Sequence, residues 1–519
     1  MKRWIAVILC LVMALSLVAC GGGSATISLD DPNEEVTLKW LFGGSNELAD
    51  ENMVYEEFNK QLPNYLPNTQ VEFETIPFAD YAEKWKLLAA SREKYDVVWN
   101  GWMLDYQSEI ARGSYIELDA LVDEYGKDLK AELPQWLLDC NRVGGKLYSI
   151  PCYQMSSLQY GVYVKKDVAE KYLDIEAAQA MINKGTDYTV EDFKVWEDFL
   201  TKAQAAGELG KGVSYSFFEY IMGYLGLPEG RGKFEFMGEG SRCAVFYDDV
   251  ENMKVYDVNF DFPNNNAYYD LTADWYQKGF MRKDIISVQD KKEDEGKKNG
   301  NILWYGQAFA GEEENFAKTN GFEVIIFRTP NSLFIDHGNT TTNTAIATTS
   351  EHPARAMMLI DLMNTKKGAD IYNLLTYGLE DVHYKKVSNN RIEWFGSAAP
   401  GSSSTDSYGY NKWVLGNTFN AYETQFDKEG WNDYILNEIN GKAVPSPLMG
   451  FTLDTTPIQL ELTQYGNIMK EYEYLLTGAV ANYDEIRQER NAKLKEAGAE
   501  RIQAEMQRQI DEWRKAVGK

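Results

Sequence analysis

Residues 95–106 hold the residue types that first indicate a ligand site. Residues 96–99 (Asp-Val-Val-Trp) are mostly apolar, a pattern typical of a strand buried on both faces of a parallel sheet, and Asn100-Gly101-Trp102 interrupts this run. In open α/β sheets, ligands bind beyond the carboxyl ends of the strands. Asn100 and Trp102 are therefore candidate ligand contacts. Trp102 could instead cover the edge of the core, because buried aromatics are common.

The sequence contains no common catalytic or metal-binding motif. Its three histidines, His337, His352 and His383, are not spaced i, i+4, and no CxxC, HExxH, GxxxxGK[ST] or GxGxxG pattern occurs. The sequence therefore lacks the commonest motifs of zinc-binding and nucleotide-binding sites. Acidic residues are plentiful, but no pair stands at a spacing that singles it out for acid–base catalysis. We therefore expect neither a metal nor a cofactor. The absence of a motif does not exclude catalysis, but it makes catalysis a weaker expectation.

Composition and charge narrow the ligand class. The 13 Trp, 33 Tyr and 23 Phe make 13% of the residues, an excess that suits a protein whose rings stack on flat apolar faces of a ligand. The net charge of −27 argues against nucleic acid, because phosphates would be repelled. It also argues against electrostatic docking on an anionic membrane.

The N-terminus has the pattern of an export signal. Lys2 and Arg3 precede an apolar stretch from Trp4 to Leu15, which is too short to span a membrane as a helix. Residues 17–20 (Leu-Val-Ala-Cys) resemble a bacterial lipobox, in which Cys20 is lipidated and becomes the mature N-terminus. We expect residues 1–19 to be a signal peptide and residues 20–35, which are rich in Gly and polar residues, to be a flexible tether.

Three cysteines remain beyond Cys20. Cys140 and Cys152 could pair across the intervening turn, and Cys243 would then be left alone. We expect buried free thiols by default.

Strands alternate with helices along the chain, which predicts a parallel sheet with helices on both faces. Ser45 or Asn46 is expected to cap the first helix. We predict strands at 36–42, 69–76, 96–99, 159–165, 301–307, 321–327 and 342–347. We predict helices at 47–62, 80–91, 105–112, 118–125, 167–172, 190–206, 266–278, 352–365, 456–476 and 483–517.

Taken in order, these motifs resemble the extracellular solute-binding lipoproteins of bacterial ABC importers, of the carbohydrate-binding type. The likeness extends over nearly the whole mature chain. It is carried by residues 96–102, 111–118 (ARGSYIEL), 145–151 (GKLYSIP), 345–361, 377–384 (YGLEDVHY) and 450–457 (GFTLDTTP). The last two are similar to a branch of putative aldouronate and other oligosaccharide-binding lipoproteins with a long C-terminal extension.

The resemblance implies an α/β, two-lobed periplasmic-binding-protein-like fold with crossing hinge strands, whose lobes close on the ligand. Lobe 1 would comprise residues 36–152 and 338–384, and lobe 2 residues 153–337 and 385–450. Residues 451–519 would form the C-terminal helical extension.

The resemblance also indicates which residues line the cleft between the lobes. It favours Ser45, Asn46, Asn100, Trp102, Tyr153, Gln154, Trp304 and Gln307. Trp394, Tyr408, Tyr410 and Trp413 lie in an aromatic stretch assigned to lobe 2 that could line the same cleft. Trp102 and Trp304 are the leading candidates.

The expected function is the capture of an oligosaccharide by a lipid-anchored monomer outside the cell and its delivery to ABC permease subunits. An aldouronate would need a well-placed Arg or Lys, and none is evident, so a neutral oligosaccharide is at least as well supported. A peptide-binding lipoprotein and, behind it, a lipid-anchored glycoside hydrolase are the alternatives.

Overall fold

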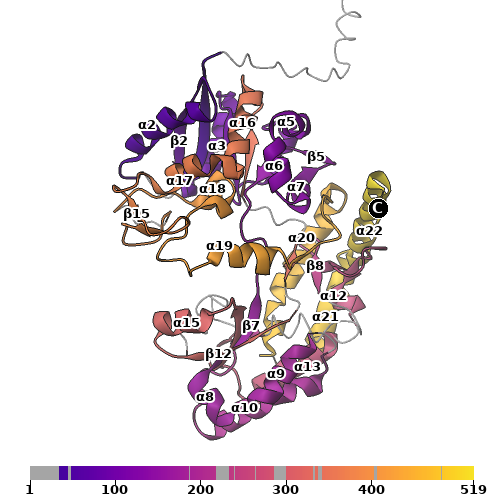
Figure 1. Cartoon of the computed structure of the whole chain (residues 1–519). Helices are drawn as coiled ribbons and strands as arrows, with labels where there is room; N and C mark the ends of the chain where they lie inside the picture. Colours follow the sequence, from indigo (N-terminus) through magenta and orange to yellow (C-terminus); the bar gives the residue numbers. More distant parts are fainter. Residues whose placement is uncertain are drawn as a thin grey trace, which may run out of the picture.

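The computed structural model describes residues 34–44, 48–185, 188–214, 216–217, 233–238, 240–262, 265–285, 300–330, 333–336, 342–401, 406–480 and 482–518. Figure 1 shows two α/β lobes, one above the other, with C-terminal helices along one side. Among the described residues, no helix is both long enough and apolar enough to cross a membrane.

Lobe 1, the upper lobe in Figure 1, is built on a five-stranded sheet in the order β2-β1-β3-β14-β6. β1 pairs in parallel with β2 and β3, as predicted from the alternation of strands and helices, whereas β14 runs antiparallel to β3 and β6. The strands are β1 (Val36–Gly44), β2 (Thr69–Pro77), β3 (Val97–Gly101), β6 (Ser149–Pro151) and β14 (Thr342–Ile346). The helices are α2 (Glu51–Gln61), α3 (Phe78–Ser91), α4 (Tyr106–Ala111), α5 (Asp119–Tyr125), α6 (Lys127–Glu132), α7 (Gln135–Cys140), α16 (Pro353–Asn364), α17 (Ala369–Tyr377) and α18 (Lys412–Leu415).

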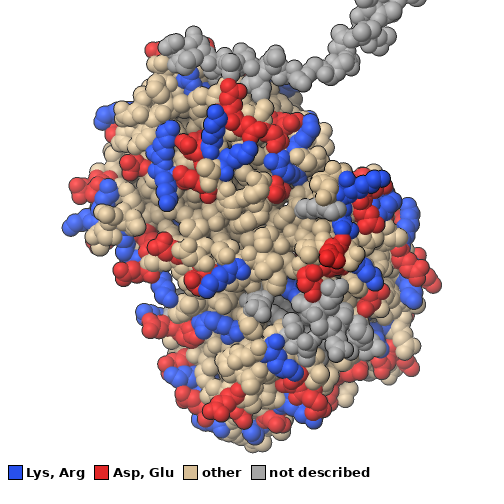
Figure 2. All heavy atoms as spheres, turned by 45° about the vertical axis from the view of Figure 1, so that its right-hand side comes forward, with Lys and Arg blue, Asp and Glu red and all other residues tan. Residues whose placement is uncertain are grey.

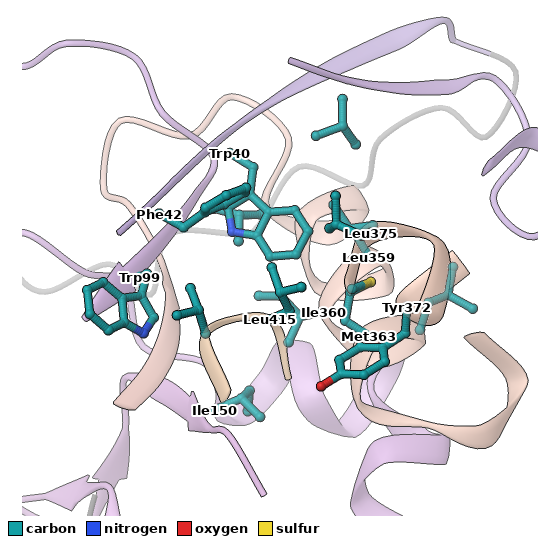
Figure 3. Packing of buried hydrophobic residues seen from close by; sticks show 14 of the residues in the cluster. Trp40, Phe42, Trp99, Ile150, Leu359, Ile360, Met363, Tyr372, Leu375 and Leu415 are labelled. Carbon is teal, nitrogen blue, oxygen red and sulfur yellow. The ribbon is translucent and has the colours of Figure 1, made fainter. Parts of the chain in front are cut away.

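The core of lobe 1 draws on segments far apart in the sequence. Figure 3 shows Trp40 and Phe42 of β1 packed with Leu359 and Ile360 of α16 and with Leu415 of α18. Ile392, Trp394, Tyr408 and Tyr410 belong to the same buried cluster. Our assignment of residues 385–450 to lobe 2 is therefore wrong for residues 385–422. Their apolar side chains bury against the sheet of lobe 1, where the hairpin β15 (Tyr384–Lys386) and β16 (Ile392–Trp394) also lies.

Lobe 2 has a smaller sheet in the order β11-β7-β12, and both strand pairs are antiparallel. The parallel arrangement of lobe 1 does not extend to it. The strands are β7 (Tyr160–Lys165), β11 (Leu303–Gln307) and β12 (Val324–Arg328). The helices are α8 (Lys166–Tyr172), α9 (Ile175–Lys184), α10 (Lys194–Ala205), α13 (Asn265–Gln277) and α15 (Glu312–Asn320).

Two segments connect the lobes directly, and a third leads from lobe 1 to the C-terminal helices. The first runs from β6 to β7, and the second runs from β12 to β14 through β13 (Phe334–Ile335). The third contains α19 (Trp431–Tyr434), a π-helix (Ile435–Asn440) and β17 (Val444–Pro445). β13 and β17 pair in parallel, so two of the three connections are joined to each other.

The C-terminal extension forms a body with an earlier part of the chain. Its helices are α20 (Gln459–Glu471), α21 (Tyr483–Glu496) and α22 (Ala499–Val517), and they share a buried cluster with the sheet β10-β9-β8. These strands are β8 (Phe234–Phe236), β9 (Cys243–Phe246) and β10 (Tyr256–Asp257), followed by α12 (Val258–Asp261). We call this unit the C-terminal body. The single helix predicted at 483–517 is two helices, because Gly498 breaks it with a φ of 96°.

The first helix begins later than the sequence indicated. α2 starts at Glu51, with Asp50 as its N-cap residue, so neither Ser45 nor Asn46 caps it. Ser45 and Asn46 lie outside the described residues.

A buried carboxyl group joins the C-terminal helices to the strands of the C-terminal body. Asp257 is 1% exposed, and it accepts a hydrogen bond from the Tyr465 hydroxyl of α20 at 2.9 Å. Burial raises the pKa of Asp257 to about 6, although the hydrogen bonds to it act in the opposite direction. Between its unfolded pKa and this value, the folded state therefore binds more protons than the unfolded state.

We predict that Asp257 makes the protein less stable as the pH rises from about 4 to about 6, with no further loss above that. The contribution should be at most ~3 kcal/mol. Urea unfolding of the wild type and of Asp257→Asn at pH 4.5 and 7 measures it. The free energy of unfolding of the wild type should fall more over this interval than that of the variant. Equal pH dependence in both proteins would contradict the prediction.

Candidate functional site

Four aromatic rings gather at the carboxyl end of β3 in lobe 1. The Trp102 ring lies 5.3 Å from Phe78, 5.3 Å from Trp413 and 5.7 Å from Trp99, measured between ring centroids. Phe78 and Trp413 are stacked at 5.5 Å with their planes 20° apart. Trp102 is 55% exposed and Trp99 is fully buried beneath the group. We call Phe78, Trp102 and Trp413 the aromatic platform.

Small residues at the strand ends make room for the platform. A Cβ atom at Gly101 would lie 2.0 Å from the Trp99 ring, and one at Gly43 would lie 2.5 Å from it. Contacts this short are not tolerated, so these strand ends must lack side chains where the indole passes. The Tyr81 hydroxyl donates a hydrogen bond to the Trp99 carbonyl at 2.6 Å. The platform therefore rests on a tightly packed base.

A second aromatic group lines a cavity of about 610 Å³ between lobe 2 and the third connecting segment. Phe309, which follows β11, meets Trp431 of α19 edge to face at 5.6 Å. Phe426 lines the same cavity and is 49% exposed. We call this space the Trp431 cavity. Its size and its apolar, aromatic wall are typical of small-molecule sites.

Charged groups form the rest of this cavity. Glu312, Glu314 and Asp427 contribute carboxylates, and Lys318 and Lys428 contribute ammonium groups. Lys428 Nζ donates to the Ala310 carbonyl at 2.9 Å. Within the described parts of the chain, Glu312, Glu314 and Lys318 form no ion pair, so they can meet a ligand. Figure 2 shows acidic and basic side chains interspersed over both lobes, with mostly uncharged surface between the lobes.

Arg328 fixes the lobe 2 side of the Trp431 cavity. It forms a two-pronged ion pair with Glu313, at 2.8 and 2.7 Å, and donates to the Phe309 carbonyl at 2.8 Å. The guanidinium holds the pKa of the Glu313 carboxyl below its usual value. Phe309 is therefore presented on a loop whose backbone is held by a planar, charge-assisted pair.

Of the predicted contacts, Trp102 and Trp413 lie together and accessible in the aromatic platform. Their neighbour Asn100 is 2% exposed and accepts a hydrogen bond from the Tyr115 hydroxyl at 2.9 Å. Asn100 is therefore a core residue in this structure, and the geometry does not support a ligand contact for it.

The first connecting segment holds two more predicted residues. Tyr153 is 8% exposed, and its ring packs on Phe419 at 4.8 Å. Gln154 is half-buried, and its carbonyl accepts a hydrogen bond from Asn440. Gln154 therefore joins the first connecting segment to the third, and Tyr153 packs the first segment on lobe 1.

Trp304, one of our two leading candidates, is a packing residue in this structure. It is 6% exposed and stacks on Tyr163 at 5.3 Å with Phe316 beside it. Gln307 is exposed at the end of β11 and stays a candidate.

Trp394 is also buried, and its indole donates to the Ala398 carbonyl at 2.9 Å. Tyr408 and Tyr410 are buried in lobe 1, where Tyr410 donates to the Gly43 carbonyl at 2.6 Å. The geometry therefore does not support ligand contacts for these three residues.

Phe78, Phe309 and Trp431 were not among the contacts predicted from the sequence. Phe309 could have been found by the rule that selected Trp102, because it stands two residues beyond the end of β11, whereas Trp304 lies inside the strand. Trp431 lies in a connecting segment that no periodic pattern marks.

The cysteines in the described part of the chain are separate from one another. Cys140, Cys152 and Cys243 are free thiols there, as expected. Burial raises the pKa of each to about 12, so the thiols stay protonated at neutral pH. No group of His, Cys, Asp or Glu among the described residues could hold a metal ion.

Comparison with known proteins places this geometry in a family. Residues 43–370 match the model of bacterial extracellular solute-binding proteins, and residues 447–515 match a domain of unknown function, DUF3502. A carbohydrate ABC transporter substrate-binding protein of Streptococcus pneumoniae serotype 4 is 22% identical, over 97% of this chain and 96% of the relative.

Solved structures share the fold. The N-glycan transport solute-binding protein NgtS of Streptococcus pneumoniae superposes with a TM-score of 0.69 at 18% identity, covering 92% of this chain and 99% of that one. An extracellular solute-binding protein of Bifidobacterium longum subsp. infantis gives 0.58 at 11% identity, covering 92% and 98%. The family match spans more than half of the chain, and the two-lobed fold agrees with it, so this protein belongs to the bacterial extracellular solute-binding proteins.

Proposed function

We propose that this protein captures a neutral oligosaccharide between its lobes and delivers it to an ABC permease. The observation that carries the proposal is the aromatic platform, where Trp102 stays 55% exposed beside Phe78 and Trp413. Sugar rings present flat C–H faces that stack on such rings, and their hydroxyl groups pair with polar side chains.

The Trp431 cavity supplies the polar partners that the platform lacks. Its lysines donate and its carboxylates accept hydrogen bonds, as a ring of sugar hydroxyls requires. The three carboxylates outnumber the two ammonium groups, and the whole chain carries a net charge of −27. A uronate would be repelled on both grounds, so a neutral sugar fits better.

The relatives support the same ligand class. One relative is named a carbohydrate ABC transporter substrate-binding protein. The structure of NgtS in complex with Man5GlcNAc superposes on this chain with a TM-score of 0.55. A permease partner follows from the role of the family in ABC import.

We also propose that Cys20 carries the lipid anchor after removal of residues 1–19. The tether of residues 20–35 could reach about 50 Å when extended. β1 begins at Val36 and runs toward Gly43, which lies near the platform. A tether joined at Val36 therefore attaches at the end of the sheet away from the platform and leaves the site accessible. We propose that the protein acts as a monomer on the outer face of the cell membrane.

We predict that neutral oligosaccharides raise the melting temperature of the purified protein, whereas uronate oligosaccharides and peptides do not. A ligand at 100 times its Kd adds about 2.7 kcal/mol, which corresponds to several degrees. A thermal-shift screen over manno-, gluco-, xylo- and arabino-oligosaccharides, uronates and peptides measures this. Stabilisation by peptides alone would support the peptide-binding alternative, and sugar cleavage during incubation would support the hydrolase.

We predict that Trp102→Ala and Trp413→Ala each weaken binding of the ligand from that screen at least tenfold. Losing a stacked aromatic side chain costs about 1.5–3 kcal/mol. Calorimetric titration measures the affinity. Phe395→Ala is the matched control, because Phe395 is 49% exposed in lobe 1 but belongs to neither aromatic group. Full affinity in both tryptophan variants would refute the platform as the site.

We predict that Cys20→Ser moves the protein from the membrane fraction to the culture medium, because the anchor would be lost. Fractionation of bacteria expressing either form, followed by immunoblotting, measures this. Membrane retention of the variant would contradict lipidation at Cys20.

A further inference from the structure

The hydroxyl group of one buried threonine forms hydrogen bonds with two tryptophans, one beneath the aromatic platform and one within it. Thr342, the first residue of β14, is 3% exposed. Its Oγ1 accepts a hydrogen bond from Trp99 Nε1 at 2.6 Å and donates one to the Trp413 carbonyl at 2.9 Å. A single hydroxyl therefore joins the base of the platform to one of its outer members.

The Trp99 indole cannot be held equally well without this partner. It is fully buried, and a buried indole N–H normally has an acceptor. Its ring lies within 5.5 Å of Phe78, 5.7 Å of Trp102 and 6.2 Å of Trp413. A rotation of this indole would therefore displace every member of the platform.

Thr342 also stands where two connecting segments enter lobe 1. It is paired with Gly101 across β3 and β14, one residue before Trp102. Its carbonyl accepts a hydrogen bond from the backbone N–H of Cys152, at the end of β6, where the first connection begins. The second connection, which returns from lobe 2, leads directly into Thr342.

We propose that Thr342 is a positioning residue for the ligand site. Its hydroxyl group fixes the orientation of Trp99 and the place of Trp413, and so presents the platform ready to stack. Because its backbone is bonded to the connecting segments, a change in the arrangement of the lobes reaches the platform through this residue. The inference rests on the proposed oligosaccharide function and names a residue that acts through the tryptophans rather than on the ligand.

The test compares Thr342→Val, which keeps the shape but removes the hydroxyl, with Thr342→Ser, which keeps the hydroxyl. The ligand is the oligosaccharide that gives the largest thermal shift with the wild type. We expect Thr342→Val to weaken its binding on the order of tenfold, as the loss of one or two hydrogen bonds that preorganise a site would do. Thr342→Ser should stay within about twofold of the wild type. Titrations are run well below the melting temperature of each variant.

A double-mutant cycle separates positioning from general stability. In a Trp413→Ala background one of the rings that Thr342 positions is already gone, so Thr342→Val should cost less affinity than it does in the wild type. A general loss of stability would cost the same in both backgrounds. Trp99→Phe gives a second route if Thr342→Val does not fold, because it removes the indole donor and should reproduce the loss of affinity.

Three results would overturn the proposal: unchanged affinity in Thr342→Val, no rescue by Thr342→Ser, or an equal cost in both backgrounds. If the proposed function is wrong, the wild type itself will bind no oligosaccharide. That result differs from all three results above, in which the wild type binds.

Discussion

The burial of the Trp99 indole is the interaction on which lobe 1 and its ligand surface both depend. The indole lies in the lobe 1 core, and it supports Phe78, Trp102 and Trp413 from below. Burying a side chain of this size contributes roughly 1.5–3 kcal/mol to stability. Since the same packing that stabilises the lobe also orients the exposed rings, a ligand that stacks on them meets a surface that needs little ordering.

The connections between the lobes are bound to the C-terminal body. The Ser446 hydroxyl donates to the buried Glu235 carboxylate of β8, and the Tyr247 hydroxyl donates to Asp336. Ser446 and Asp336 directly follow β17 and β13, the paired connecting strands. Tyr472 and Leu475 of the C-terminal body are buried in the main cluster of lobe 2. Lobe 2, the C-terminal body and this strand pair are therefore held together by buried contacts.

Local sequence patterns predicted the strands well, whereas the site residues stay a prediction. Short apolar runs ending in Gly located β1 and β3, and Trp102 was chosen as a candidate because it directly follows a strand. Trp304 was misjudged because its strand position alone does not reveal Tyr163 and Phe316, which bury it. Residues 385–422 were given to the wrong lobe because their placement depends on distant bonds, such as that from Tyr410 to Gly43. No periodicity within a segment encodes a partner 367 residues away.

Two groups of aromatic side chains keep apolar surface in contact with water. Trp102 and Phe426 leave about half of their surface in water, one on lobe 1 and one beside the cavity next to lobe 2. Each lies among other aromatic residues, unlike the single exposed Phe395, and contiguous apolar patches mark binding sites. A ligand that touches both groups removes more apolar surface from water when the lobes approach than when they are apart. Such a ligand therefore binds the closed arrangement of the lobes more tightly than the open one. This difference in affinity is what a ligand needs in order to drive closure.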